Sequence, residues 1–385
     1  MKRKLLNLKK EESTQTKMAL VVLLALVLGC LMFGSVVQAQ PVNLIPWTAE
    51  SYPAVTGFEA GVWTVAGDNF SVNQSVNGQP TLFYSDFPAF NTSFQGKIEV
   101  ETTVDNDFIG FALGFLPGDT SNSSADYLLV DWKQGDQWFD FGPPSDTPES
   151  LAYEGLAVSH VFGIPTADEF WGHLNFNHSS SDLNNGLQEL QRGATLGSTG
   201  WVDNQEYKFK FEFTSTSLKV FVDDTLEIDI TGSFSDGRIA FYNFSQATVT
   251  YSGFTVASLV DIDIKPGSFP SSVNLKSKGV TPVAIHTTDT FNATKVDPLS
   301  VMLGFCAIPV AWEQYDCDEL PNPLYGEPDE PEMIGDGDID LVLYFKTRDL
   351  YCLGDVTEVT LTGTTFGGVD IIGTSDISFV KQGKP

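Results

Sequence analysis

Short runs of alternating apolar and polar residues, separated by Gly, Asn, Asp and Ser, fill the sequence from residue 42 to residue 256. An alternation of period two places apolar side chains on one face of a strand, so these runs predict half-buried antiparallel strands. One stretch, residues 181–192, has Leu at near-helical spacing and indicates a helix instead. We expect strands at residues 61–65, 70–76, 81–84, 96–103, 108–115, 127–133, 156–162, 207–215, 217–222, 225–231, 238–244 and 248–256.

This pattern also predicts the fold class. Many short strands without an alternation of helices and strands favour a sandwich or barrel and argue against a parallel sheet. Asp223-Asp224, between the strands expected at 217–222 and 225–231, has the length of a two-residue hairpin turn. We therefore predict an all-β sandwich over residues 42–257.

The length of the chain, 385 residues, exceeds what one small core fills, so a second domain is expected. A new unit starts near residue 258. Its first strand, residues 260–264, is broken by Lys265-Pro266-Gly267-Ser268, and further strands are expected at 273–275 and 280–285. We predict a smaller β-sandwich-like domain over residues 260–380.

The first 39 residues have the pattern of a signal peptide. Six Lys and Arg residues precede an uncharged run at residues 18–37, and Val37-Gln38-Ala39 suits a cleavage site. The sequence therefore predicts a protein that is secreted, extracellular or at the cell surface. Because the apolar run is also long enough to span a bilayer, an uncleaved N-terminal anchor stays open, and a membrane partner is expected only in that case.

The net charge of the chain is −29. A field of this sign repels phosphate backbones, so we predict no nucleic-acid partner. It attracts cations, although acidity that only keeps a secreted protein soluble explains the charge as well.

Two acidic stretches have the composition of a calcium site. Asp105, Asn106 and Asp107 present three oxygen-bearing side chains in a row before a strand, and Asp336, Asp338 and Asp340 alternate with Gly and Ile. Carboxylate and carbonyl oxygens are the ligands that Ca²⁺ prefers. The alternative is a polar turn, since Asn and Asp commonly bond their own backbone.

Aromatic residues gather between the expected strands, at residues 138–141 and 170–178. Trp138, Phe170, Trp171 and His173 are candidates for a platform that binds sugar rings or a partner protein, because aromatic faces give a large contact area. The alternative is that these rings pack under a long loop.

Removal of the signal peptide leaves three cysteines, Cys306, Cys317 and Cys352. An odd count leaves one cysteine without an intramolecular partner, and we expect a disulfide from Cys306 or Cys317 to Cys352. The spacing does not decide between the two.

All-β sandwiches also carry glycoside hydrolases, which need two carboxylates about 5 Å apart when they retain configuration. Glu227 and Asp229 lie on one face of an expected strand, but Gly232 follows where an acid/base residue would be needed. We therefore predict no enzyme.

The acidic turn also carries a family resemblance. Residues 105–111, then Gly114-Phe115, Tyr127 and Asp131-Trp132-Lys133-Gln134 resemble the core of the thrombospondin C-terminal domain, in which an acidic turn leads into Gly-Phe and a Trp-Lys-Gln strand. The resemblance covers residues 42–257. It implies a concanavalin- or lectin-like jelly-roll sandwich that binds calcium and serves adhesion.

Residues 262–298 are similar to a module that recurs at the ends of secreted environmental bacterial proteins. This likeness implies a bacterial source and an accessory domain. From all these features we predict a secreted, calcium-binding protein that binds an extracellular glycan or protein without catalysis. A structural surface-layer or matrix component is the alternative, and a glycoside hydrolase is a remote one.

Overall fold

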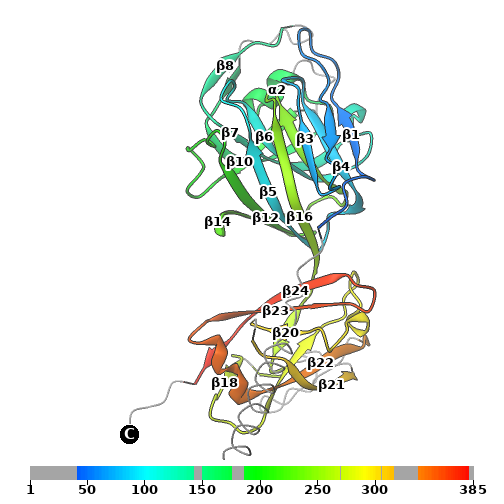
Figure 1. The fold of residues 1–385 in the computed structure, drawn as a ribbon, viewed down its shortest axis with the longest axis vertical. Coiled ribbons are helices and arrows are strands. Elements are labelled where there is room, and N and C mark those ends of the chain that lie inside the picture. Colours follow the sequence, from blue (N-terminus) through cyan, green and yellow to red (C-terminus); the bar gives the residue numbers. More distant parts are fainter. Residues whose placement is uncertain are drawn as a thin grey trace, which may run out of the picture. The chain divides into compact units, whose positions relative to one another are not determined.

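The computed structural model describes residues 41–142, 150–175, 186–268, 270–304, 306–315 and 337–380 (Figure 1). The predicted signal peptide, Cys317 and Asp336 lie outside these residues. Within them, no helix has the length and the apolar character of a membrane span.

Two facing sheets form the N-terminal part. The first sheet has the order β1-β4-β15-β6-β7-β10-β11, with β1 (Thr48–Ser51), β4 (Thr81–Pro88), β15 (Arg238–Phe244), β6 (Phe108–Phe115), β7 (Asp126–Lys133), β10 (Gly155–Phe162) and β11 (Gly186–Arg192). The second sheet runs β14-β13-β12-β5-β16, with β14 (Thr225–Thr231), β13 (Ser217–Val222), β12 (Glu206–Phe213), β5 (Thr92–Val100) and β16 (Val249–Leu259). Strand β3 (Ser71–Gln74) pairs with β16 and with β2 (Trp63–Val65).

Aromatic rings from both sheets fill the space between them. The rings of Phe241 and Tyr251 stack with centroids 4.5 Å apart, and those of Phe94 and Phe254 with centroids 4.7 Å apart. Phe111, at the centre of β6, contacts rings from the facing sheet. Burial of such large apolar surfaces is the main force that holds two sheets together. The predicted all-β, lectin-like jelly-roll sandwich is confirmed.

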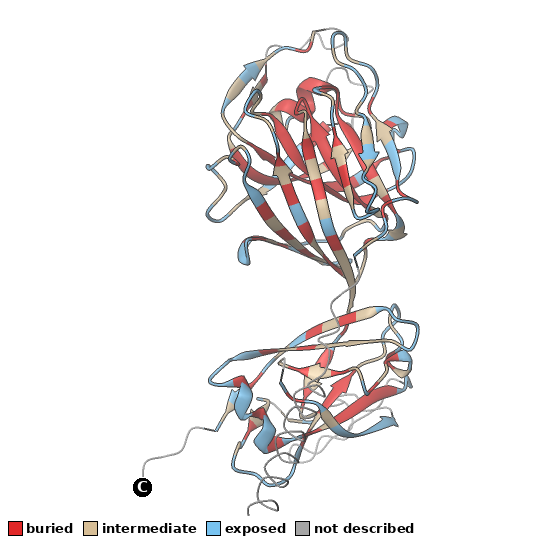
Figure 2. Cartoon of the chain, in the orientation of Figure 1, coloured by how far each residue is buried: buried red, intermediate tan, exposed pale blue. Residues whose placement is uncertain are grey.

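The outer face of the seven-stranded sheet is also covered. Every residue of β6 is buried, so both faces of this strand are packed, and Figure 2 shows buried residues throughout the sandwich. The cover comes from β8 (Gln137–Phe139), β9 (Ser150–Ala152) and α2 (Ala167–Gly172). Thr166 and Glu169 cap the start of α2 reciprocally, which fixes where this short helix begins. A second hydrophobic core therefore lies outside the sandwich.

The prediction of a helix at residues 181–192 is wrong for residues 186–192, which are the part of this stretch that the structure describes. Residues 186–192 form β11, which pairs with the edge of β10. Leu187 is buried in the second core and Leu190 is 42% exposed, because a step of three residues puts two side chains on opposite faces of a strand.

The C-terminal part has its own hydrophobic core. A four-stranded sheet contains β17 (Ile262–Ile264), β19 (Val280–Ile285), β22 (Asp340–Lys346) and β21 (Pro309–Tyr315). Leu341, Leu343 and Phe345 of β22 pack in this core with residues of β20 (Met302–Leu303), β23 (Glu358–Thr364) and β24 (Asp370–Asp376). Strand β18 (Ser272–Val273) pairs with β25 (Ser378–Phe379). Short 3₁₀ helices occur at Asp119–Ser121, Ala293–Lys295 and Thr347–Leu353.

A disulfide joins Cys306 to Cys352, with Cα atoms 6.2 Å apart. This pair is one of the two that the sequence left open. Cross-linking residues 46 positions apart restricts the unfolded chain and so stabilises this part of the protein.

Candidate functional site

The acidic turn at residues 105–107 surrounds a lysine. The Nζ atom of Lys133 lies 2.8 Å from Oδ1 of Asp107, 2.7 Å from the carbonyl oxygen of Asn106 and 3.2 Å from its Oδ1. Oε1 of Gln137 lies 3.0 Å from the same nitrogen. Because the side chain of Lys133 has no exposed surface, the turn holds a buried internal cation.

The register of the sheet explains this contact. Antiparallel pairing of β6 and β7 places Lys133 opposite Phe108, next to the residues of the turn. The ring of Trp171 lies under the ammonium group, with its centroid 4.9 Å from Nζ. Burial lowers the pKa of Lys133, and the charge of Asp107 opposes that shift. The ion pair, the hydrogen bonds and the ring together compensate a charge that is far from water.

Asp105 forms the outer side of the turn. It is partly exposed, and its carboxylate accepts hydrogen bonds from the side chain of Asn77 and from the backbone N–H of Asn106. Burial and the nearby charge of Asp107 raise the pKa of Asp105 to about 7. Asp105 and Asp107 therefore lie close enough for their charges to interact, and the ammonium group of Lys133 is hydrogen-bonded to Asp107.

This geometry tests whether the predicted residues suit calcium. Oδ1 of Asn106 accepts a hydrogen bond from Lys133, so a cation bound there would compete with this lysine for that oxygen. The proximity of Asp105 and Asp107 does suit a divalent cation, which would relieve the repulsion between the carboxylates. Among the residues that the structure describes, no three His, Cys, Asp or Glu side chains form a metal-binding group.

The second acidic stretch is described only in part, since Asp336 lies outside the described residues. Asp338 is exposed, whereas Asp340, the first residue of β22, is buried. Oδ1 of Asp340 accepts the backbone N–H of Thr287 at 2.8 Å, and Oδ2 lies 3.4 Å from Nδ1 of His286. Asp340 therefore ties β22 to the end of β19.

Two of the predicted aromatic candidates are in the core. Phe170 and Trp171, both in α2, are at most 1% exposed and pack against the outer face of the sheet. Their centroids lie 4.6 Å from the ring of Tyr52 and 5.3 Å from that of Phe141, respectively. For these two rings the packing alternative applies. Trp138 is 58% exposed and offers its ring to solvent.

His173, which ends α2, belongs to a charged cluster that the sequence did not reveal. Its Nε2 lies 3.1 Å from Oδ2 of Asp131 on β7, and its Nδ1 lies 3.4 Å from Oε2 of Glu189 on β11. Arg192 pairs with the other oxygen of Glu189 at 3.1 Å. The one signal in the sequence was Asp131, a carboxylate inside an otherwise apolar strand.

The cluster holds His173 in its charged form. Burial alone would lower the pKa of His173, but the contacts with Asp131 and Glu189 outweigh burial and raise this pKa to about 9. Hydrogen bonds from His173 and Arg192 lower the pKa of Glu189 to about 2. The cluster thus fastens the end of α2 to two strands of the sheet.

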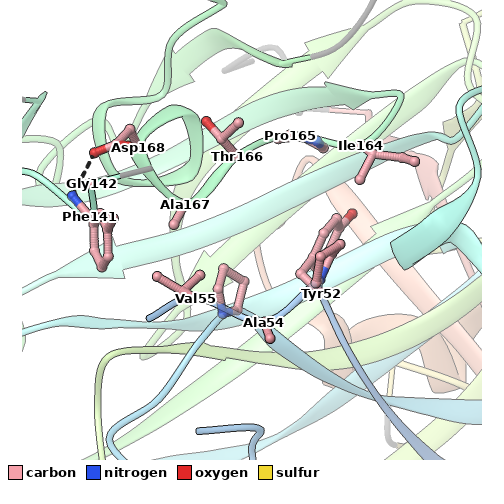
Figure 3. A pocket seen from close by; sticks show the side chains of 12 residues that line it. Tyr52, Ala54, Val55, Phe141, Gly142, Ile164, Pro165, Thr166, Ala167 and Asp168 are labelled. Atoms are coloured by element: carbon pink, nitrogen blue, oxygen red, sulfur yellow. Dashed lines mark hydrogen bonds between the residues drawn. The ribbon is translucent and has the colours of Figure 1, made fainter. Parts of the chain in front are cut away.

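A pocket of about 210 Å³ opens beside α2 (Figure 3). Its lining is mostly apolar and includes Tyr52, Val55, Phe141 and Ile164. Oδ1 of Asp168 accepts the backbone N–H of Phe141 at 3.0 Å and so closes one side. The pocket is an extension of the second core toward the surface.

Comparison with known proteins assigns the sandwich to a family. Residues 59–259 match the model of the thrombospondin C-terminal region, which is more than half of the chain. The chain belongs to this family. The resemblance carried by the acidic turn and the Trp-Lys-Gln strand is confirmed.

Curated relatives match the same part of the chain. Thrombospondin-3b of Danio rerio is 24% identical over 199 residues, which is 49% of this chain and 20% of that protein. Thrombospondin-4 of Xenopus laevis is 24% identical over 202 residues, 49% of this chain and 19% of the relative. The thrombospondin C-terminal domain of this chain thus corresponds to about a fifth of the length of these relatives.

Among solved structures, the carbohydrate-binding module CBM66 from Bacillus subtilis is similar with a TM-score of 0.34 and 12% identity, covering 53% of this chain and 98% of that one. A likeness this distant says nothing about the ligand of the thrombospondin C-terminal domain.

Proposed function

We propose that this chain is a secreted, non-catalytic adhesion or recognition protein that binds an extracellular glycan or protein. Membership of the thrombospondin C-terminal family is the observation that carries this proposal. The signal-peptide pattern of the first 39 residues supports export. We also propose that the module at residues 260–380 is an accessory domain of the same exported protein.

The surroundings of Glu227 support a role without catalysis. Glu227 is buried, and its carboxylate accepts the backbone N–H groups of Thr195 and Leu196 at 2.8 and 3.0 Å. The hydroxyl of Thr195 donates to its other oxygen. A carboxylate used in this way anchors a loop and is poorly placed to attack a sugar.

Calcium is the cofactor that we propose. Asp105 and Asp107 would supply carboxylate oxygens at the rim of the sandwich, and water would complete the shell. Asp336, Asp338 and Asp340 would form a second site in the C-terminal part. Bound calcium would neutralise neighbouring carboxylates and so stiffen the loops that carry them.

Calcium should raise the melting temperature and release or absorb heat on titration. At a concentration of 100 Kd, one site adds about 2.7 kcal/mol to the free energy of unfolding. Asp105→Asn should remove the contribution of the first site and Asp338→Asn that of the second. Asp229→Asn, which changes an exposed carboxylate on β14, is the matched control and should behave like the wild type. No heat and an unchanged melting temperature would refute the calcium proposal.

An array of glycans and matrix proteins, probed with calcium and then with a chelator, tests the proposed recognition. We expect binding in calcium that weakens or disappears when the chelator is added. The structural alternative has a different signature, which is calcium-dependent assembly in sedimentation. Assembly without binding to any arrayed molecule would replace the recognition proposal with a surface-layer or matrix role.

A further inference from the structure

At one open end of the sandwich, the inner face of the seven-stranded sheet extends beyond the hydrophobic core. Leu128 on β7 and Val158 on β10 belong to that core. Asp126 lies two residues from Leu128, and His160 lies two residues from Val158. Because side chains alternate along a strand, Asp126 and His160 point to the same face of the sheet as these core residues. Asp126 and His160 therefore make the inner face of the sheet polar at this end of the sandwich.

A pocket of about 220 Å³ opens at this end. Leu113 and Leu128 lie among the apolar residues of its lining, Asp126 and His160 among the polar ones, and Phe234 comes from the loop after β14. A second hollow, of about 470 Å³, shares Asp126 and His160 with the first. The two side chains thus border both hollows.

The carboxylate of Asp126 has acceptor capacity to spare. Oδ1 lies 2.7 Å from Nε2 of His160, and Oδ2 accepts the hydroxyl of Ser235 at 3.0 Å. Two oxygens of an ionised carboxylate accept about four hydrogen bonds. Because the side chain of Asp126 is 55% exposed, a ligand has access to the remaining positions.

The wall formed by residues 231–237 is fixed before any ligand arrives. Gly232 and Phe234 donate their N–H groups to the carbonyl oxygens of Thr216 and Ser215, each at 2.9 Å. Gly237 packs so closely that an added Cβ would lie 2.2 Å from the carbonyl oxygen of Gly114. A preformed wall lowers the entropy lost on binding.

We propose that this end pocket binds one neutral sugar ring of an extracellular glycan. Neighbouring hydroxyls of the ring donate to Asp126, and its apolar face lies against Phe234. The first pocket, of about 220 Å³, has room for about one ring, since pockets for drug-sized molecules span about 300–1,000 Å³. The aspartate and the net charge of −29 disfavour acidic sugars. The inference rests on the proposed recognition function and specifies its ligand.

Saturation-transfer NMR of the full chain with glucose, galactose, mannose and N-acetylglucosamine tests this proposal. At least one sugar should show transfer to its ring protons. Asp126→Ala should lower the affinity for that sugar about tenfold, as expected for the loss of charge-assisted hydrogen bonds. Ser235→Ala, which frees one carboxylate position, should change the affinity less. Asp229→Ala, an exposed carboxylate outside the pocket, should leave it unchanged.

The outcomes separate the pocket from the wider function. Equal binding of a sugar by wild type and Asp126→Ala, at equal melting temperature, overturns the pocket and leaves the recognition function in place. The absence of transfer from every sugar, together with binding to an arrayed protein or glycan, overturns the pocket alone. No binding in either experiment overturns both.

Discussion

Lys133→Met should lower the free energy of unfolding by about 3–5 kcal/mol. The substitution keeps most of the side-chain volume but leaves Asp107 as a buried charge without its partner at 2.8 Å. Burial of an unpaired carboxylate is far more costly than loss of the pair as a whole. Urea denaturation in the presence of a chelator measures the loss without interference from calcium.

Two further variants make this test specific. Lys133→Met combined with Asp107→Asn removes both charges and should recover much of the lost stability. Lys97→Met breaks an ion pair with Glu206 whose side chains are about half exposed, so it should cost less than about 1 kcal/mol. If Lys133→Met is no more harmful than Lys97→Met, the turn is not organised around this lysine.

The stability that His173 contributes should depend on pH. Its pKa is about 9 in the folded protein and 6.5 in the reference state, so the contribution is complete below pH 6.5 and disappears as pH rises through 9. The shift corresponds to a contribution on the order of 3 kcal/mol. The low pKa of Glu189, about 2, keeps this carboxylate ionised at mildly acidic pH, and the stability that Glu189 contributes is lost as pH falls toward 2.

His173→Asn is the variant to compare with the wild type, because Asn tolerates the positive φ of 51° at this position. The difference in unfolding free energy should be largest between about pH 5 and 6.5, should fall as pH rises from 6.5 to 9, and should be nearly lost above pH 9. His160→Asn, in an exposed ion pair, is the control and should cost little. A difference that stays constant from pH 5 to pH 10 would mean that His173 acts through packing alone.

Local patterns predicted the strands of the sandwich well. Strands β6, β13, β14 and β15 have the predicted bounds. An alternation of period two marks β13 and β14, whereas β6 and β15 are short apolar runs that begin and end near Gly, Asp or Ser. Asp223 and Asp224, with φ of 47° and 64°, form the predicted hairpin turn. Strand β11 was not predicted. Residues 186–192 are extended because they pair with the edge of β10, and no local pattern in the sequence signals that pairing.

The candidate site shows the same limit. The oxygen-rich turn was visible in the sequence, but Lys133 lies 26 residues after Asp107 and reaches it only through the register of β6 and β7. The partners of His173 are likewise set by sheet pairing. Burial of Phe170 and Trp171 was one of two alternatives that the sequence left open, and the second core decides between them.

That second core has a consequence for where molecules can be recognised. A sheet that is covered on both faces, as the seven-stranded sheet is around β6, exposes no broad surface to a ligand. Its middle strand serves only as scaffold. For this seven-stranded sheet, contact with other molecules then falls to its margins, where the strands end and the connecting segments begin. Variation in those segments can change the preferred partner while the sealed interior stays the same.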